Sequence, residues 1–431
     1  MRTHNFSLFS LVFAIILTWL SLRGESKTYW GDIQVLKGLQ SELDPDSVNP
    51  GSCVSSWDFK LDPCDNLFSD KFTCGFRCDS VDESGTSRIT ELALDQAGYS
   101  GSLSSLSFHL PYLETLDLSN NFFSGPLPNS LSNLTRLRRL GLSGNSFSGE
   151  IPASSIGNLT SLEELFLDNN RLEGEIPASL NSLKSLKRLE LQSNNFSGEF
   201  PDLGSLENLV FLDASNNLIS GEIPENLPAS LVEISLRNNS LEGKIPWSVK
   251  SLGFLQVMDL SHNRLGDSVP SFLFTHQSLQ QLTLSSNKFT SVQSPVFQYG
   301  VVGSELIALD LNDNEIGGLL PSFFCLMPKL SALSLENNKF TGMIPTQYAI
   351  KTVRPGSGVS PFTRLLLGQN YLLGPIPGPL TLLKPGSAHV ELTGNCLFQC
   401  PEIFFFCQGG EQKSLIECKA FGPIIPRRKK I

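Results

Sequence analysis

The chain has 431 residues, a formal net charge of −10 and 17% charged residues. Proteins that bind nucleic acid usually present a basic surface, so this acidic balance disfavours that class. The length would ordinarily suggest two or three domains. However, one phrase recurs through most of the chain and predicts a single continuous repeat array instead.

The first 26 residues have the features of a cleaved secretory signal peptide. Arg2 supplies the positive charge, residues 8–20 form an uncharged apolar run, and the small residues Gly24 and Ser26 precede a cut before Lys27. The alternative is a membrane anchor, but the apolar run is shorter than the ~20 residues that a membrane-spanning helix needs. We therefore expect a secreted, extracellular protein whose mature chain has no transmembrane segment.

Residues 27–88 are predicted to form an N-terminal cap with an amphipathic helix and four cysteines. In the segment DIQVLKGLQSEL, Ile33, Leu36 and Leu39 fall on one helical face, and Asp32 is the expected N-cap.

Eight of the nine cysteines fall into two groups of four at the ends of the repeat array. In a secreted chain this pattern predicts disulfide-stapled caps, although each group allows three pairings and the sequence does not choose among them. Zinc is the alternative for the Cys396-x3-Cys400 spacing, but an oxidising compartment favours disulfides. Cys325 stands alone and is expected to be a small buried residue. The predicted disulfide cysteines are Cys53, Cys64, Cys74, Cys78, Cys396, Cys400, Cys407 and Cys418.

Residues 89–395 repeat the phrase LxxLxLxxN in about eleven good copies with worn copies at both ends. Its leucines alternate as a strand requires and predict one short core-facing strand per copy, which would stack into a parallel sheet. The asparagine that follows each strand is expected to join a buried hydrogen-bonded ladder rather than to contact a ligand. The first positions are Leu113, Leu137, Leu162, Leu186, Leu209, Leu231, Leu255, Leu279, Leu306, Leu330 and Phe362, and the asparagines are Asn121, Asn145, Asn170, Asn194, Asn217, Asn239, Asn263, Asn287, Asn314, Asn338 and Asn370.

Each copy then predicts a bend followed by a short helical turn. A glycine stands at a fixed offset after the asparagine, as in Gly221 and Gly243, where the chain needs a tight bend. Apolar residues such as Leu131 and Leu134 follow at helix-like spacing and predict short 3₁₀ turns.

Some copies depart from this pattern. Residues 265–270 have no glycine at the repeated offset. Residues 346–361 form an insertion that is expected to be a loop, and its Lys351 and Arg354 are a second candidate contact. The array is followed by a cysteine-rich C-terminal cap at residues 396–418 and a basic tail at 419–431, which is expected to be solvated.

The repeat form xxLxxLxLxxNx[FL][ST]GxIP resembles the plant-type extracellular leucine-rich repeat found in receptor-kinase ectodomains, receptor-like proteins and polygalacturonase-inhibiting proteins. The resemblance covers roughly residues 28–418, and both cysteine-rich ends resemble the caps of that family. It implies an α/β repeat fold, a right-handed leucine-rich repeat solenoid with a parallel concave sheet and a second small sheet. It also implies a location in the apoplast or cell wall.

No catalytic or cofactor motif is found, so the sequence predicts a protein that is not an enzyme, with no cofactor and no metal. The residues between the inward leucines should face outward on the concave side. There, aromatic, arginine and carboxylate side chains gather as they do in recognition sites. The predicted ligand-binding residues are Phe166, Arg188, Glu190, Phe211, Asp213, Glu233 and Arg237.

Four sequons of the N-x-[ST] form support the secreted compartment. They lie at Asn133, Asn158, Asn195 and Asn238. A glycan at Asn238 would partly screen the neighbouring Arg237.

The function favoured by these features is non-catalytic recognition of a peptide, glycan or protein in cell-surface signalling or defence. A membrane receptor kinase is a candidate partner, and nucleic acid is not. The alternative is inhibition of a secreted cell-wall-degrading enzyme such as polygalacturonase. A structural cell-wall role is less favoured, because no proline-rich extensin-like tail is present.

Overall fold

The computed structural model describes residues 27–296, 303–398 and 400–421. The predicted signal peptide and most of the predicted basic tail lie outside the described residues. The chain divides into two compact units: one comprises residues up to 148 with 154–162, and the other comprises 149–153 and the residues from 163 onward. Within the described ranges, no helix combines the length and the apolar character needed to cross a membrane.

The first unit begins with the predicted cap helix, α2 (Trp30–Glu42). It buries Leu36 and Leu39 completely, as its apolar spacing predicts. The prediction of Asp32 as the N-cap is wrong, because the helix starts after Tyr29 and has no side-chain cap. Asp32 is instead fully buried and accepts two hydrogen bonds from Arg88, at 2.8 and 3.0 Å, so a buried ion pair ties the helix to the chain that leads into the repeats.

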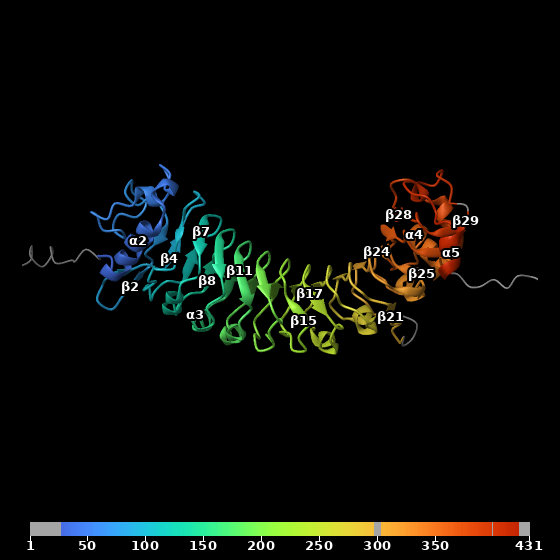
Figure 1. The fold of residues 1–431 in the computed structure, drawn as a ribbon, viewed down its shortest axis with the longest axis horizontal. Helices are drawn as coiled ribbons and strands as arrows, with labels where there is room; N and C mark the ends of the chain where they lie inside the picture. Colours follow the sequence, from blue (N-terminus) through green and yellow to red (C-terminus); the bar gives the residue numbers. More distant parts are fainter. Residues whose placement is uncertain (1–26, 297–302, 399, 422–431) are drawn as a thin grey trace, which may run out of the picture. The chain divides into compact units, whose positions relative to one another are not determined.

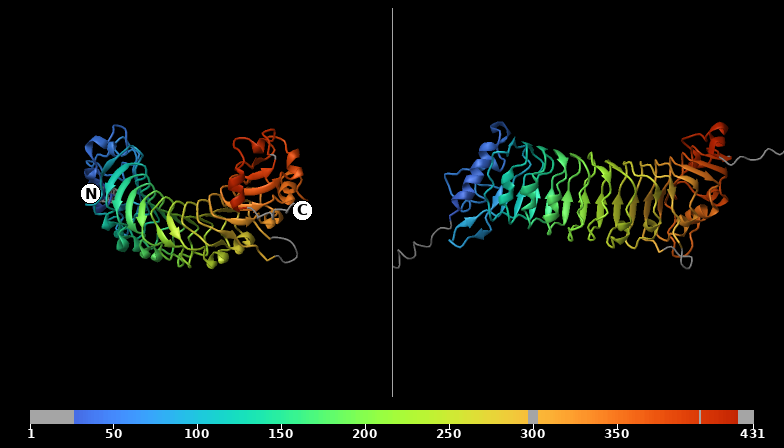
Figure 2. Two further views of the ribbon diagram at one scale, coloured as in Figure 1. Left: turned by 45° about the vertical axis from the view of Figure 1, so that its right-hand side comes forward. Right: turned by 60° about the horizontal axis from the view of Figure 1, so that its bottom comes forward.

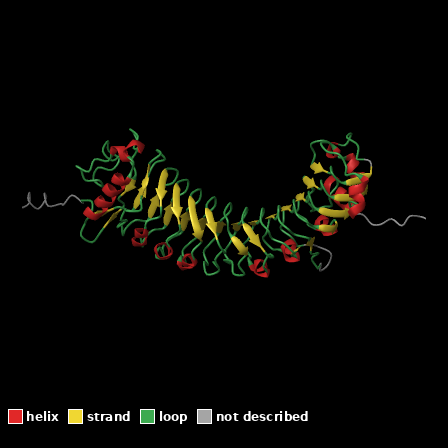
Figure 3. Ribbon diagram, in the orientation of Figure 1, coloured by secondary structure: helices red, strands yellow, loops and turns green. Residues whose placement is uncertain are grey.

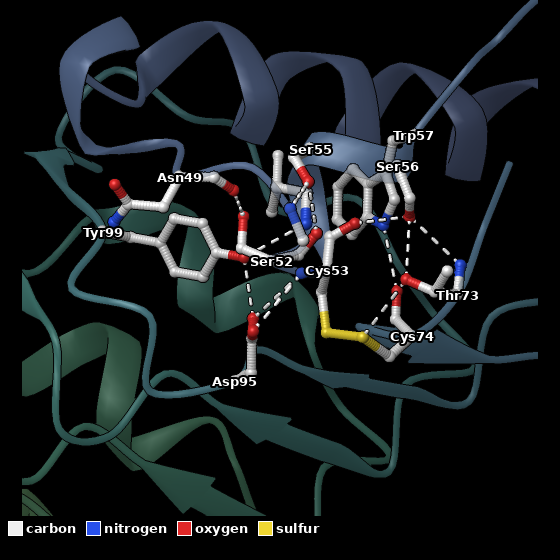
Figure 4. The surroundings of a disulfide bond; sticks show 12 residues. Asn49, Ser52, Cys53, Ser55, Ser56, Trp57, Thr73, Cys74, Asp95 and Tyr99 are labelled. Carbon is white, nitrogen blue, oxygen red and sulfur yellow. Dashed lines mark hydrogen bonds between the residues drawn. A yellow bond between two sulfur atoms is a disulfide. The ribbon is translucent and has the colours of Figure 1, made fainter. Parts of the chain in front are cut away.

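Two disulfides close the N-terminal cap, Cys53–Cys74 and Cys64–Cys78. Around the first of them, the indole Nε1 of Trp57 donates to the Cys74 carbonyl at 3.0 Å (Figure 4). Asp95 accepts a hydrogen bond from the hydroxyl of Tyr99 at 2.7 Å and faces the backbone N–H of Cys53 at 3.3 Å. The bridge is therefore held inside a hydrogen-bonded network that reaches the first repeat.

The first unit carries two sets of strands. The main sheet of this unit begins with a strand pair that is antiparallel and continues with parallel pairs. Its strands are β1 (Phe76–Arg77), β4 (Glu91–Ala93), β6 (Thr115–Asp117) and β8 (Arg139–Gly141). The other elements are the hairpin β2 (Ser80–Val81) and β3 (Ser87–Arg88), the parallel strands β5 (Ser100–Ser102), β7 (Phe122–Gly125) and β9 (Ser146–Gly149), and the helices η1 (Pro45–Ser47), η2 (Val54–Ser56), η3 (Asn129–Asn133) and α3 (Ala153–Gly157).

The second unit continues the repeat with a parallel main sheet, one strand per copy in chain order (Figures 1 and 2). The middle residue of each strand is buried and, in most strands, its two neighbours stay partly accessible, as at Leu189 between Arg188 and Glu190. In β24 and β26 the third residue, Ser334 or Leu366, is buried as well. This alternation confirms the predicted phase. The strands are β10 (Glu164–Phe166), β12 (Arg188–Glu190), β14 (Phe211–Asp213), β16 (Glu233–Ser235), β18 (Val257–Asp259), β20 (Gln281–Thr283), β22 (Ala308–Asp310), β24 (Ala332–Ser334), β26 (Arg364–Leu366) and β28 (His389–Glu391).

A second set of short strands, with helical turns in many of the coils, completes the repeats of this unit (Figure 3). The strands after the asparagine form small parallel sheets, which confirms the second sheet implied by the family resemblance. They are β11 (Arg171–Glu175), β13 (Asn195–Ser197), β15 (Ser220–Glu222), β17 (Ser240–Glu242), β19 (Ser268–Val269), β21 (Ser291–Val292), β23 (Gly317–Leu319), β25 (Lys339–Gly342), β27 (Tyr371–Pro375) and β29 (Cys396–Phe398). The helices are η4 (Ala178–Ser182), η5 (Trp247–Ser251), η6 (Ser271–Thr275), η7 (Ser322–Leu326), α4 (Thr346–Val353), η8 (Gly378–Leu382), η9 (Phe405–Cys407) and α5 (Leu415–Phe421).

The asparagine ladder is confirmed, and its bonds run from one coil to the coil before it. In the copy at Asn217, the amide Oδ1 accepts from the N–H of Phe196 at 3.1 Å, and Nδ2 donates to the carbonyl of Leu191 at 3.1 Å. The same pair of bonds recurs at Asn263 and Asn338. The asparagine side chain of one coil therefore hydrogen-bonds to the backbone of the coil before it.

The ladder extends beyond the predicted Asn370 and then ends on a different residue. Asn395 makes the same bonds to the preceding coil. The coil that contains Asn395 is closed by Gln412, whose Oε1 accepts from the N–H of Leu397 and whose Nε2 donates to the carbonyl of Leu392, both at 3.1 Å. A glutamine of the C-terminal cap thus takes the place of the next asparagine.

The repeated glycine marks a backbone bend, as predicted. Gly221 and Gly243 have φ of 77° and 79°, a region in which residues with a Cβ are strained. In the copy that lacks this glycine, Asp267 adopts a φ of 66°.

Two disulfides also staple the C-terminal cap, Cys396–Cys418 and Cys400–Cys407. All eight of the predicted cysteines are therefore paired within their own ends of the chain. The disulfides exclude the zinc alternative at Cys396 and Cys400. Cys325 is free and buried, and burial raises the pKa of its thiol to about 12.

The first half of the predicted loop at residues 346–361 is the helix α4. Lys351, on this helix, is not a surface contact. Its side chain is buried, with Nζ donating to the Met327 carbonyl at 2.6 Å and lying 5.0 Å from the centre of the Phe362 ring. Tyr348 and Thr352, on the same helical face, are buried too, so the helix packs this lysine inward. Burial lowers the pKa of Lys351 to about 8. Arg354 is exposed, so only half of the predicted second contact is accessible.

Candidate ligand-binding site

Strand register brings the predicted site residues into two neighbouring columns on the face of the main sheet opposite the core. Arg188 pairs with Phe211 on the next strand, and Phe211 pairs with Glu233 on the strand after that. The second column runs from Phe166 through Glu190 to Asp213 and on into β16. Paired residues lie about 4.8 Å apart because that is the spacing of neighbouring strands.

Arg188 is the centre of this arrangement. Its guanidinium carbon lies 3.9 Å from the centre of the Phe211 ring and 5.9 Å from that of Phe166, and its Nε lies 2.5 Å from a carboxylate oxygen of Glu190. The Arg188 side chain is 41% exposed, whereas that of Glu190 is 13% exposed. We call Phe166, Arg188, Glu190 and Phe211 the arginine cluster. It holds a partly accessible guanidinium in a fixed orientation, because the ring contacts and the ion pair constrain it from different sides.

The two phenylalanines are half-buried rather than exposed. The expectation of two exposed aromatics is therefore corrected: much of each ring packs on the sheet and against Arg188, and only the remainder can contact a ligand.

Gln192 extends the arginine cluster and was not predicted as a site residue. Its Nε2 donates to the second carboxylate oxygen of Glu190 at 3.0 Å. Its Oε1 is buried and has no hydrogen-bond partner within the described residues. Because this atom has almost no accessible surface, the role that the contacts give Gln192 is to hold the Glu190 carboxylate beside Arg188. The sequence showed only that position 192 varies between copies, which does not distinguish a site residue from a tolerant one.

Carboxylates continue along the second column beyond the arginine cluster. Burial raises the pKa of Asp213, and the charges of Glu190 and Asp259 add to this effect, although hydrogen bonds from Ser215 oppose it. Burial likewise raises the pKa of Asp310 and of Glu336, with further contributions from neighbouring carboxylates. Arg364 acts in the opposite direction on both of these groups, so its positive charge partly offsets this acidic part of the face.

The other predicted site residues are not part of the arginine cluster. Glu233 is half-buried beside Phe211 in the register, and Arg237 is exposed at the end of its strand. Within the described part of the chain, neither side chain forms an ion pair. Asp168, which was also expected to face outward, is buried.

The four predicted sequon asparagines are all exposed. Asn195 lies on β13, whereas Asn238 follows the main-sheet strand of its coil, and its Nδ2 donates to Asn216 at 3.0 Å. Exposure permits glycosylation at each position, and occupancy stays a prediction.

Across the described ranges, no group of three or more histidine, cysteine, aspartate or glutamate side chains is arranged to hold a metal ion. The chemistry that the site offers is recognition: donors on Arg188, acceptors on the partly accessible carboxylates, and two aromatic surfaces.

Leucine-rich repeat family models match most of the repeat array. One described as leucine rich repeat matches residues 87–147 and 277–340, one described as leucine rich repeats (2 copies) matches residues 160–205, and another leucine rich repeat model matches residues 136–159, 208–229, 230–252 and 254–275. Together these matches cover more than half of the chain.

Curated relatives include plant receptor-like proteins. The chain is 37% identical over 101 residues to receptor-like protein 18 of Arabidopsis thaliana, which is 23% of this chain and 12% of the relative. It is 34% identical over 121 residues to receptor-like protein 43 of the same plant, covering 28% of this chain and 16% of the relative. The chain therefore matches only a small part of the length of these relatives.

Solved structures share the fold over most of the chain. The crystal structure of PEPR1-AtPEP1 matches with a TM-score of 0.64 and 28% identity, covering 85% of this chain and 55% of that one. A plant ice-binding protein matches with a TM-score of 0.52 and 22% identity, covering 90% of this chain and 99% of that one, which shows the shared fold alone. With the repeat, the asparagine ladder and the paired cysteine caps in place, the chain belongs to the leucine-rich repeat family, and part of it is similar to plant receptor-like proteins.

Proposed function

We propose that this protein is a non-catalytic recognition protein that binds an extracellular peptide on the main-sheet face of its second unit. The observation that carries the proposal is the arginine cluster, in which Arg188 lies against Phe211 and is paired with Glu190 while remaining 41% exposed. Preorganised aromatic and arginine side chains are characteristic of the residues that dominate binding energies at interfaces.

A peptide suits the hydrogen-bonding groups around the cluster better than an apolar ligand. The guanidinium of Arg188 retains N–H donors for a ligand carbonyl or carboxylate, and the partly accessible carboxylates of Asp213 and Glu233 can accept from a ligand N–H. A peptide backbone presents both groups at every residue. The half-buried rings of Phe166 and Phe211 supply apolar surface beside them.

The proposed setting is the extracellular side of a plant cell, in signalling or defence, with a membrane receptor kinase as a candidate partner. Four disulfides support an oxidising compartment. The exposed sequons and the similarity to receptor-like proteins support the same setting.

The test is selection of peptides from a random display library on the purified protein, followed by measurement of their dissociation constants. Replacing Phe166, Arg188 and Phe211 together by alanine is expected to weaken the selected peptides at least tenfold, because it removes the ring contacts and the guanidinium donors.

The matched control replaces Gln281, Arg364 and His389 by alanine, since these exposed residues occupy the same column in other coils. Peptides that bind the cluster variant as tightly as the unchanged protein would sink the proposal. Equal losses in both variants would also contradict it, because they would place binding elsewhere on the face.

A further inference from the structure

A hollow of about 560 Å³ lies on the first unit, beside the N-terminal cap and apart from the arginine cluster of the second unit. Its walls include Asp44, Asp46 and Asn49 from the chain after helix α2 and Gly98, Ser100 and Phe122 from the first repeats. No lysine, arginine or histidine lines it.

Backbone contacts hold the two walls of this hollow together. The N–H of Asp44 donates to the Ser100 carbonyl at 2.8 Å, directly after the isolated bridge between Leu43 and Gly101. The opposite loop is fixed by the first ladder residue, Asn121, whose Oδ1 accepts from the N–H groups of residues 98 and 99 at 3.1 and 3.0 Å. The hollow is thus part of the ordered framework of the repeat.

Phe122 is an aromatic side chain that the packing of the fold does not explain. It is 66% exposed, whereas the next residue, Phe123, is fully buried in the core. The ring extends over Gly98, where a Cβ would approach its Cε2 to 3.3 Å, so a larger residue at 98 would crowd the ring. The ring lines the same hollow as Asp44 and Asp46.

The hydrogen-bonding groups of the hollow are mostly acceptors, because its side-chain donors are already used within the protein. The Ser100 hydroxyl donates to Oδ2 of Asp44 at 2.6 Å, and Asn49 Nδ2 donates to the Ala97 carbonyl at 3.1 Å. The Ser47 hydroxyl donates to the Asp44 carbonyl at 2.7 Å. The second oxygen of Asp44, the Asp46 carboxylate and Oδ1 of Asn49 accept no hydrogen bond within the described residues.

We propose that this hollow binds an arginine side chain of a protein partner. A guanidinium carries five N–H donors and no acceptor, which complements a donor-poor, acceptor-rich wall. Its planar face stacks on aromatic rings, as the face of Phe122 permits. Its positive charge matches the two aspartates. A neutral sugar could also donate hydroxyls to these carboxylates, but it would gain nothing from their charge.

The test places a fluorine reporter in the hollow itself, so that binding elsewhere on this acidic protein does not interfere. Phe122 is replaced by 4-fluorophenylalanine, and the fluorine NMR signal is followed during titration with acetyl-Gly-Arg-Gly-amide. We expect a saturable shift, a dissociation constant at least fivefold weaker for the peptide with citrulline in place of arginine, and at least threefold weaker binding after Asp46→Asn.

Matched controls separate the hollow from general charge effects. The same label at Leu218, which is 60% exposed at the equivalent position of another coil, is expected to show no saturable shift. Asp70→Asn, an exposed change in the same cap, is expected to leave the titration unchanged. Equal binding of the citrulline peptide, an unaffected Asp46→Asn titration, or a shift caused by cellotetraose in place of the arginine peptide would each overturn the assignment.

Discussion

Lys351 is a buried amine, and burial disfavours its charged form, so the stability of the protein should depend on pH. Burial lowers its pKa from 10.5 to about 8, so the unfolded chain holds the proton more tightly than the folded one. Stability therefore rises with pH between about 8 and 10.5, where the folded state has released the proton and the unfolded state still binds it. At about 1.4 kcal/mol per pKa unit, the upper bound of the effect is roughly 3 kcal/mol.

We predict that Lys351→Met removes this rise. The measurement is the urea midpoint of the second unit from pH 7 to pH 10, compared between the two proteins, so that other titrating groups cancel. Lys384→Met, at an exposed position, is the control and should retain the rise. Parallel pH profiles for Lys351→Met and the unchanged protein would show that the burial of this amine has no energetic weight.

Single residues also show which parts of the site were predictable from sequence. The outward position of Phe166, Arg188 and Phe211 follows from the leucine phase, because a period of two decides which side chains leave the core. Gln192 was missed because its role is a side-chain hydrogen bond to Glu190, and the repeat pattern does not record contacts between variable positions. Lys351 was wrongly placed in an exposed loop, because a lysine on the buried face of a short helix cannot be distinguished in the sequence from a lysine in a loop.

At the scale of elements, the repeats, the cap helix and the grouping of the cysteines were predictable, whereas the cysteine pairing and the closure of the last coil were not. Every coil repeats the same bonds, so one aligned phrase specifies strands, ladder and bends together. The cysteine pairing depends on how nonrepeating chain folds over the end coils. Spacing therefore left three pairings open at each end. Gln412 closes the last coil from a segment that has no repeat partner in the sequence, so it could not be aligned with the asparagines it replaces.

The N-terminal cap element gives a second prediction. Replacing Cys53 and Cys74 together by alanine should lower the stability of the first unit by about 2–5 kcal/mol, because the bridge restricts the unfolded chain. Trp57 donates to the Cys74 carbonyl and is only 6% exposed, so its fluorescence should shift to the red as the cap loosens.

Hydrogen exchange locates this effect. Peptides from helix α2 should exchange faster in the double variant, while peptides from α4 keep their rates. Cys325→Ala is the control, since that cysteine has no disulfide partner. If α2 exchanges at the same rate in the double variant and the unchanged protein, the bridge does not hold the cap.

At the scale of the whole molecule, recognition and enzyme inhibition make different demands. The arginine cluster spans three neighbouring strands, a size that suits a peptide, whereas a stable protein–protein interface usually buries about 800 Å² on each partner. We therefore expect that adding the protein in tenfold molar excess leaves the release of reducing ends by fungal polygalacturonases unchanged. A dose-dependent fall in that release would instead favour the inhibitor role.

The asparagine ladder also bears on how such a molecule can change its length. Besides strand pairing, each coil takes from its successor one side-chain amide at one position, and the final coil obtains that amide from Gln412. A gene duplication that copies one whole coil would bring its own asparagine and leave both ends intact. The binding face could thus gain or lose coils in single steps during evolution, while the caps that protect its ends stay the same.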